Sequence, residues 1–180
     1  MIETKKSAPW PTMFRFVVLL WIIELINLVL GHGLSRFGII PRTMTGLPGI
    51  FFAPFLHGSM GHILMNTLPL LVLGSFVLIL GRRIFFTITP VIIIVSGLGV
   101  WLVGRSAIHV GASSLIFGYF GFLVFRGLIK RSPVSLAISI LTIAVYGGLL
   151  WGIFPGTPGV SWEGHFFGFL TGMLCARMYR

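Results

Sequence analysis

The amino-acid sequence predicts an all-α integral membrane protein, a single domain over residues 1–180 built on a bundle of six transmembrane helices. Three observations support this fold class: the composition, the number of apolar runs and the distribution of basic residues. Hydrophobic residues make up 56% of the chain and charged residues only 9%, and the mean hydropathy is +1.04. Soluble domains carry about a quarter charged residues, so a lipid bilayer must form part of this protein's surroundings.

Apolar runs long enough, or nearly so, to cross a bilayer about 30 Å thick recur along the chain. The six runs lie at 14–31, 61–80, 84–104, 113–130, 133–153 and 163–179. Only a few residues join the second run to the third and the fourth to the fifth, so these neighbours must be antiparallel. The first run is too long for most signal peptides and no cleavage site follows it. We therefore expect it to be retained after a short cytoplasmic tail, residues 1–13.

The first connection, residues 32–60, is much longer than the others. Its sequence is HGLSRFGIIPRTMTGLPGIFFAPFLHGSM, rich in Gly and Pro but also in Phe, Ile and Leu. Such a segment is too apolar to lie in water and too interrupted to form a seventh span. We expect a partly embedded structure in the outer interface of the membrane.

The basic residues indicate how the spans are oriented. If the N-terminus is cytoplasmic, Arg36, Arg42 and Arg105 fall on the outer side of the membrane. The other ten fall on the inner side: Lys5, Lys6, Arg15, Arg82, Arg83, Arg126, Lys130, Arg131, Arg177 and Arg180. The positive-inside rule then predicts that both termini are cytoplasmic, in a multi-pass cell membrane that is the inner membrane if the host is a bacterium. Basic residues placed between apolar runs favour a bilayer, not a nucleic acid, as the partner of the net +10 charge.

Polar groups in lipid are costly, so each needs a partner or a task. His62 and Asn66 are four residues apart, and therefore lie on one face of the second span. His165 stands beside a Gly164, Gly168, Gly172 repeat that lets another helix approach the sixth span closely. The fourth span carries its own small residues: Ser114, Gly118 and Gly121. Interhelical hydrogen bonding is the alternative explanation for His62 and Asn66, but close packing does not explain a histidine in hydrocarbon.

The depths of these groups in the membrane agree with one another. Counting from the arginines at the inner ends of their spans, Ser113, His165 and Asn66 lie roughly 20, 18 and 24 Å along their helices. All three therefore fall in the outer half of a core about 30 Å thick. Groups at one depth on neighbouring helices are expected to form one site.

A serine, a histidine and an asparagine can together perform nucleophilic acyl transfer. A neutral imidazole deprotonates the hydroxyl, while the Asn66 amide, the His62 ring and the Ser113 backbone N–H could stabilise the oxyanion. The chain contains no aspartate, and its three glutamates, Glu3, Glu24 and Glu163, are poorly placed to orient His165. Composition therefore favours a Ser–His dyad over a triad.

Three motifs in this order resemble those of the rhomboid intramembrane serine proteases. They are HGSMGHILMN at 57–66, GASS at 111–114 in place of Gly-x-Ser-Gly, and GHFFGFLTG at 164–172. The resemblance covers nearly the whole chain, including the six-span core and the long first loop. The fifth span and the segment FPGTPGVSW at 154–162 resemble the gate and the cap over the site.

The resemblance implies a role for each matched residue. Ser113 corresponds to the nucleophile, His165 to the general base, and His62 and Asn66 to the oxyanion-stabilising side chains. Four further positions correspond to residues that support the site: Gly111, Phe117, Gly164 and Gly168. The family cleaves transmembrane segments of other membrane proteins near their outer ends, so we expect such segments as substrates, a site open to the non-cytoplasmic side, and neither a cofactor nor a metal.

The chain departs from the family pattern at three places. Ser114 replaces the glycine that follows the nucleophile, and Phe117 replaces the usual tyrosine one turn below it, so a ring can stack on His165 but a phenol hydrogen bond is lost. The Trp-Arg pair found in the first loop of many members is missing. None of these departures removes a catalytic group.

Two alternatives to a protease remain open from the sequence. One is a non-catalytic rhomboid-like protein that binds transmembrane clients, although such proteins typically lack the serine and histidine present here. The other is a small metal or ion transporter that uses four histidines: His32, His57, His62 and His109. Metal sites of that kind usually include carboxylates or thiolates, which this chain almost lacks, Cys175 being its one cysteine.

Overall fold

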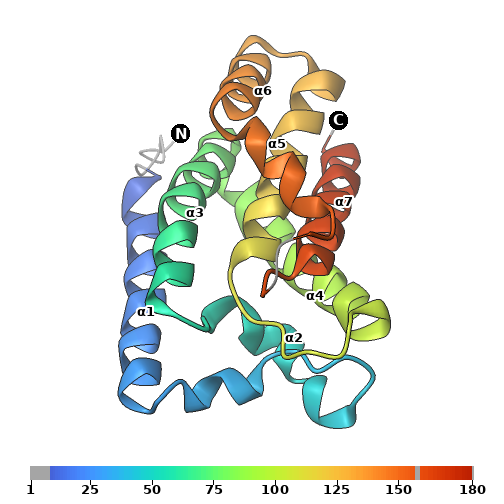
Figure 1. The fold of residues 1–180 in the computed structure, drawn as a ribbon. Coiled ribbons are helices and arrows are strands. Elements are labelled where there is room, and N and C mark those ends of the chain that lie inside the picture. The colour runs from blue at the N-terminus through green and yellow to red at the C-terminus, as the bar shows by residue number, and fades with distance from the viewer. Residues whose placement is uncertain (1–8, 157–158, 180) are drawn as a thin grey trace.

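A computed structural model describes residues 9–156 and 159–179 of the chain and places them in a bundle of helices (Figure 1). The bundle contains six long helices: α1 (Trp10–Val29), α3 (Met60–Leu80), α4 (Arg82–Val103), α5 (Ser113–Lys130), α6 (Pro133–Tyr146) and α7 (Trp162–Met178). The remaining elements are short: η1 (Gly33–Phe37), η2 (Met44–Gly46), α2 (Gly49–Phe52), η3 (Ala53–Phe55) and η4 (Gly147–Ile153). The predicted all-α, multi-pass fold is confirmed.

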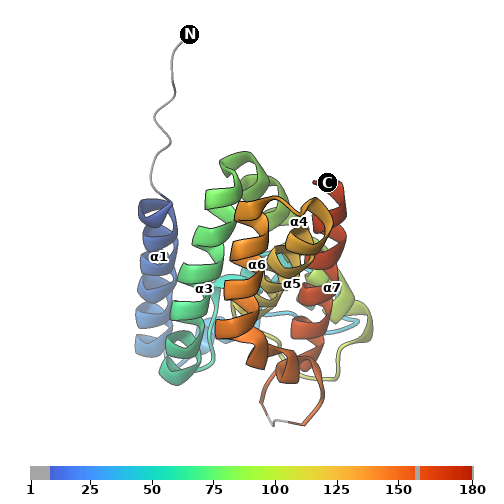
Figure 2. The ribbon, with the colours of Figure 1, turned by 90° about the horizontal axis from the view of Figure 1, so that it is seen from above.

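The lengths of the helices suit a membrane. In the described part of the chain, five helical segments are long and apolar enough to cross a bilayer, the fifth being α6 together with η4, Pro133–Ile153. Helix α7 has 17 residues, or roughly 25 Å at 1.5 Å per residue. The first residues of α1 and the last of α7 lie at the same edge of the bundle (Figure 2), as an even number of crossings requires.

Two helix boundaries differ from those expected from the apolar runs. Helix α1 begins at Trp10, so residues 10–13 belong to the first span and not to a tail. Its first turn accommodates proline because the N–H that proline lacks has no partner there in any helix. Helix α6 ends at Tyr146 and continues as the 3-10 segment η4, because two consecutive glycines, Gly147 and Gly148, disfavour the α-helix.

The long first loop is built from the short helices η1, η2, α2 and η3. It packs against α4, where the Cβ of any residue in place of Gly97 would lie 2.8 Å from the Ile50 side chain. It also pairs with the α4–α5 connection, because the backbones of Ile39 and His109 exchange two hydrogen bonds of 2.9 Å. The first loop and the α4–α5 connection are therefore held together at one end of the bundle. Its depth in the membrane stays a prediction.

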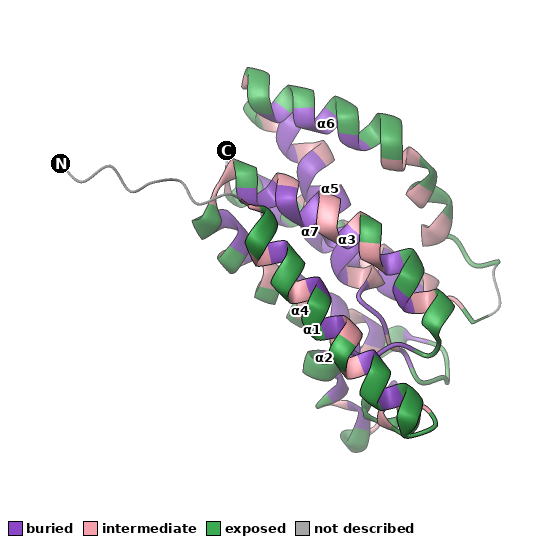
Figure 3. Ribbon diagram, turned by 90° about the vertical axis from the view of Figure 1, so that its left-hand side faces the viewer, coloured by how far each residue is buried: buried purple, intermediate pink, exposed green. Residues whose placement is uncertain are grey.

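Helix α5 lies at the centre of the bundle, between α7 and α3 (Figures 1 and 2). Nearly all of its first three turns are buried, including Leu115, Tyr119 and Phe122. Helix α6, in contrast, presents a largely exposed outer face (Figure 3). The large hydrophobic side chains exposed on α6 are Val134, Leu136, Ile140, Leu141, Ile143 and Val145. An apolar face of this kind is suited to contact with lipid.

The glycine repeats bring α5 and α7 into backbone contact. A Cβ added to Gly168 would lie 2.1 Å from the carbonyl oxygen of Ser114, and one added to Gly172 would lie 1.9 Å from that of Gly118. On the α5 side, a Cβ on Gly121 would lie 2.5 Å from the carbonyl oxygen of Phe169. Small residues on both helices are therefore required for His165 to lie beside the start of α5.

Replacing Gly172 by alanine should destabilise the fold. The added methyl group meets backbone atoms, which cannot rotate away, and overpacking of this kind costs about 1–3 kcal/mol. The midpoint of thermal unfolding in detergent measures the loss. Gly33→Ala is the matched control, because no atom of the described residues lies within 4 Å of its Cβ position. Equal midpoints for the two variants would contradict the close contact of α5 and α7.

Candidate active site

A cavity of about 790 Å³ lies among α3, α5, η4 and α7. It is lined by five of the residues that the sequence singled out: His62, Asn66, Ser113, Phe117 and His165. The other three, Gly111, Gly164 and Gly168, lie outside this lining but contact residues within it or next to it. The structure thus brings together side chains that are up to 103 positions apart in the chain, from His62 to His165.

Ser113 is the first residue of α5 and borders the cavity. The first N–H groups of a helix have no acceptor within the helix. They also carry the positive end of the helix dipole, which favours negative charge nearby. The Ser113 hydroxyl and backbone N–H are therefore positioned at a point suited to a nucleophile and to a developing oxyanion.

His165, in the first turn of α7, is 8% exposed and is held from two sides. Its Nδ1 lies 2.9 Å from the carbonyl oxygen of Gly152. Because a carbonyl only accepts, Nδ1 carries the hydrogen and Nε2 keeps its lone pair. The ring also stacks on Phe117, with centroids 4.0 Å apart and planes 8° apart. A phenylalanine at this position thus retains the stacking contact, and the imidazole is fixed in the tautomer that a base requires.

The Ser113 hydroxyl and the His165 ring make no hydrogen bond to each other within the part of the chain that the structure describes. Both side chains nevertheless line the same cavity. Catalytic hydrogen bonds are often long in ligand-free enzymes and shorten only when substrate binds. The arrangement is therefore that of a serine and a base with room between them.

Asn66 is buried on α3, 7% exposed, and its side-chain Nδ2 finds no hydrogen-bond acceptor among the described residues. An unpaired buried donor costs about 1–3 kcal/mol. Such a group is informative because native structures contain few of them. Since Asn66 lines the cavity, an acceptor that enters the cavity could take this hydrogen bond.

His62, one turn before Asn66, lies against the chain that leads into α5. A Cβ added to Gly111 would lie 2.6 Å from both Cε1 and Nε2 of the His62 ring. Gly111 also has a φ of +120°, which L side chains rarely adopt. Only glycine lets the backbone before Ser113 pass this close to His62.

His57 supports the same segment, a role that the sequence did not reveal. Its ring is fully buried, contacts the His62 ring at a centroid distance of 5.1 Å, and accepts a hydrogen bond of 3.5 Å from the Ala112 N–H. Burial, and secondly the neighbouring His62, lower the pKa of His57 to about 3. The ring is therefore neutral at physiological pH and remains an acceptor for the backbone next to Ser113.

The buried polar residues of α1, Glu24 and Asn27, do not line the cavity. Glu24 is fully buried in α1, where its Oε2 accepts from Asn27 at 3.2 Å and its Oε1 lies 3.7 Å from His32. Asn27 in turn donates to the carbonyl oxygen of His57 at 3.0 Å. In the described residues, no three side chains of His, Cys, Asp or Glu are grouped in a way that could hold a metal ion. The histidines named for a transporter thus do not form such a group there.

Comparison with known proteins identifies the group to which this architecture belongs. The family model of the Rhomboid domain matches residues 45–180. The chain is 40% identical to an uncharacterized protein of Mycobacterium tuberculosis, over 97% of this chain and 78% of that protein. It is 36% identical to an uncharacterized protein of Mycobacterium leprae, over 97% and 74%. It is also 33% identical to RHOMBOID-like protein 4 of Arabidopsis thaliana, over 67% of this chain and 31% of that protein. The fold, the order of its motifs and these matches show that the chain belongs to the rhomboid family.

Proposed function

We propose that this protein is an intramembrane serine endopeptidase that uses Ser113 as its nucleophile and His165 as its general base. The observation that carries the proposal is that both side chains line one cavity. The His165 Nδ1 is held by the Gly152 carbonyl, and its Nε2 makes no hydrogen bond to any residue that the structure describes. Membership of the rhomboid family supports the same activity. No metal and no cofactor is needed for this chemistry.

The reaction follows from the arrangement of the groups. The Ser113 oxygen attacks the scissile carbonyl carbon while the His165 Nε2 takes the hydroxyl proton. The oxyanion is stabilised by the Ser113 N–H and by the side chains of Asn66 and His62. The peptide C–N bond breaks as His165 gives its proton to the leaving amine, and the acyl group stays on Ser113. His165 then takes a proton from a water molecule that attacks the acyl carbon, and it returns the proton to the Ser113 oxygen as that C–O bond breaks. The Gly152 carbonyl orients the imidazole, so a Ser–His dyad is sufficient without a carboxylate.

The substrates are transmembrane segments of other membrane proteins, cut near their non-cytoplasmic ends. The cavity is lined by residues near the starts of α3, α5 and α7. The start of α3 lies at the edge of the bundle opposite the one at which α1 begins and α7 ends (Figure 2). The positive-inside rule supports a cytoplasmic position for the edge at which α1 begins and α7 ends. Seven of the ten basic residues that the structure describes belong to the helix ends at that edge: Arg15, Arg82, Arg83, Arg126, Lys130, Arg131 and Arg177. A site at the opposite end opens to the non-cytoplasmic side, where water is available for hydrolysis.

A second candidate function is the binding of transmembrane clients without cleavage. The missing hydrogen bond between Ser113 and His165 favours it, because a binding protein does not need the two groups aligned. The fixed His165 tautomer and the unpaired Asn66 donor favour catalysis, since neither contributes to the binding of an apolar helix.

Cleavage in liposomes distinguishes the two functions. The purified protein is reconstituted with a labelled single-span protein that carries small residues near its non-cytoplasmic end, and the products are mapped by mass spectrometry. We expect one or a few cuts near that end. A substrate that co-purifies with the protein but stays intact would contradict the protease and establish the binding protein.

Replacing Asn66 by alanine should lower kcat by on the order of 10- to 1000-fold, the usual effect of removing one oxyanion donor. KM should change little, because the bond strengthens only as the oxyanion forms. Steady-state cleavage of the same substrate measures both constants. A wild-type kcat in this variant would remove Asn66 from the oxyanion site.

A further inference from the structure

Four residues join the α4–α5 connection to the start of α7, and we call them the clasp: Arg105, His109, Ser161 and Glu163. They come from two segments more than 50 positions apart in the chain. None of them belongs to the dyad or to the oxyanion donors. Ser161 and His109 nevertheless border the space next to Ser113.

His109 is the central member of the clasp and is 5% exposed. Its Nε2 lies 3.1 Å from the carbonyl oxygen of Arg105, so Nε2 donates and Nδ1 keeps a lone pair. Nδ1 lies 2.7 Å from the Ser161 hydroxyl, which must therefore donate to it. The backbone of His109 is paired with Ile39 of the first loop. The ring and the backbone of this one residue thus connect three segments, four positions before Ser113.

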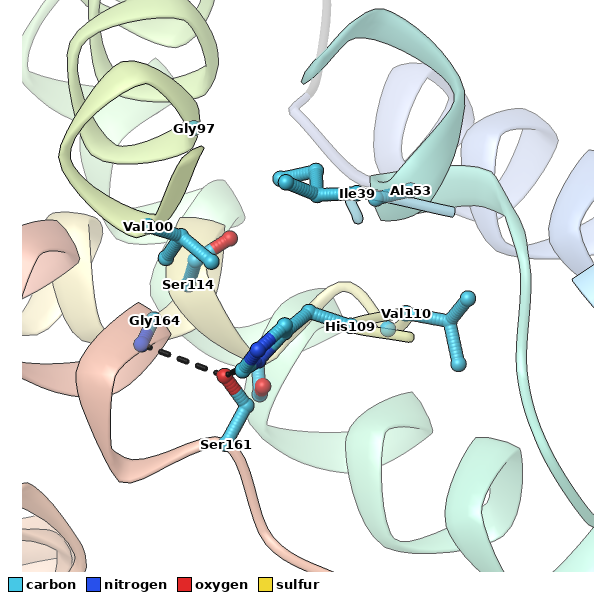
Figure 4. A pocket seen from close by; sticks show the side chains of 11 residues that line it. Ile39, Ala53, Gly97, Val100, His109, Val110, Ser114, Ser161 and Gly164 are labelled. Atoms are coloured by element: carbon cyan, nitrogen blue, oxygen red, sulfur yellow. Dashed lines mark hydrogen bonds between the residues drawn. The ribbon is translucent and has the colours of Figure 1, made fainter. Parts of the chain in front are cut away.

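Ser161 links the His109 ring to the first turn of α7. Figure 4 shows its hydroxyl between the His109 ring and the backbone nitrogen of Gly164. The hydroxyl oxygen accepts from the Gly164 N–H at 3.3 Å, which makes Ser161 the N-cap of α7. The Ser161 carbonyl accepts from the His165 N–H at 3.2 Å. The first turn of α7, which carries His165, is thereby fixed to the segment that precedes Ser113.

Glu163 and Arg105 form a second link across the same junction. Glu163 is 3% exposed, and its Oε1 accepts from the Arg105 backbone N–H at 3.1 Å. The Arg105 guanidinium lies 3.8 Å from Oε2 and donates to the Val160 carbonyl. A carboxylate in the first turn of a helix is also stabilised by the helix dipole. Glu163 therefore holds the α4–α5 connection against the start of α7.

We propose that the clasp is a positioning device for the dyad, in which His109 and Ser161 set the distance between the His165 imidazole and the Ser113 hydroxyl. This inference rests on the proposed protease function. His109 is tied to the chain that leads into Ser113, and Ser161 begins the helix that bears His165. The bond of 2.7 Å between them is a direct side-chain link between the two halves of the site.

Loss of this link should affect turnover more than substrate binding. A displacement of about 1 Å between reacting groups can cost on the order of 100-fold in rate. We therefore expect Ser161→Ala and His109→Ala each to lower kcat by about 10- to 100-fold, with KM within about threefold of wild type. Ser161→Thr keeps the hydroxyl and is expected to retain activity near wild type. The double variant should be no slower than the slower single variant, because both changes break the same bond.

Tyr119→Phe is the matched control. It removes a partly buried hydrogen bond of 2.7 Å between Tyr119 on α5 and Thr89 on α4. Neither residue lines the cavity. We expect it to keep the wild-type kcat. Three results would each overturn the proposal. The first is a double variant whose loss in kcat is the product of the two single losses. The others are a wild-type kcat in both single variants and a loss in Tyr119→Phe equal to theirs.

A measurement that needs no turnover separates this proposal from the protease itself. Ser161→Ala should speed amide hydrogen exchange at Gly164 and His165, whereas Ser161→Thr and Tyr119→Phe should leave it unchanged. Unaltered exchange in Ser161→Ala overturns the clasp whether or not the protein cleaves. A wild-type protein that fails to cleave contradicts the protease but leaves this exchange result to decide on the clasp.

Discussion

Replacing Ser113 by alanine should abolish cleavage of a transmembrane substrate, with a rate at least on the order of 10⁴-fold below wild type. The change removes a single oxygen atom from the residue that begins α5 and borders the cavity. Without it, no other group at that point can form the acyl-enzyme. Cleavage in liposomes, followed by mass spectrometry of the products, measures the effect.

The neighbouring Ser114 provides the control for this experiment. Its Cβ lies 3.7 Å from the Cβ position of Gly164, and its carbonyl contacts the Gly168 position, so it belongs to the packing face between α5 and α7. Ser114→Ala should cleave at close to the wild-type rate. Full activity in Ser113→Ala, or a loss confined to Ser114→Ala, would show that the nucleophile was assigned to the wrong serine.

The second large effect is expected for His165→Ala, again on the order of 10⁴-fold or more in kcat. The variant leaves Ser113 without a base, and it also removes the ring that stacks on Phe117 and donates to Gly152. Because the two residues act as a unit, the Ser113→Ala and His165→Ala double variant should be no slower than either single variant.

His32→Ala is the matched control for the loss of a histidine. Its ring lies near Glu24 and Asn27, and its side chain is 31% exposed and outside the lining of the cavity. Activity should remain near wild type. If His32→Ala and His165→Ala lost activity equally, the assignment of His165 as the base would have to be abandoned.

Most of the fold could be predicted from the sequence because the physical signal is strong. Long apolar runs separated by charged or Gly- and Pro-containing segments leave few alternatives in a bilayer. The ends of the helices were less predictable. The start of α1 at Trp10 depends on prolines that a hydropathy pattern treats as interruptions, and the change from α6 to η4 at Gly147 depends on backbone conformation.

Some of the residues that line the cavity could also be predicted from the sequence. The depth of a residue along its helix follows from a count of residues, and that count predicts similar depths in the membrane for Ser113, His165 and Asn66. The structure adds what a count cannot give. The direction of the His165 ring depends on Gly152, which is 13 positions away, and the closeness of His62 to the chain before Ser113 depends on the φ of Gly111.

The clasp could not be found from the sequence. His109 and Ser161 are 52 positions apart, and no sequence pattern indicates that the two side chains meet. The spacing of Glu163 and His165 predicts that this glutamate is poorly placed to orient the imidazole, but nothing in the local pattern indicates Arg105 as its partner. Contacts of this kind arise only when two connections at the same end of the bundle are brought together by the packing of α5 on α7.

The central claim is that His165 activates Ser113, and reaction with a fluorophosphonate probe tests it most directly. The probe modifies an activated serine, and mass spectrometry identifies the labelled residue. Wild type and Ser114→Ala should carry the label on Ser113, whereas Ser113→Ala and His165→Ala should carry none. A folded wild-type protein that stays unlabelled, or a label on Ser113 that persists in His165→Ala, would contradict the account.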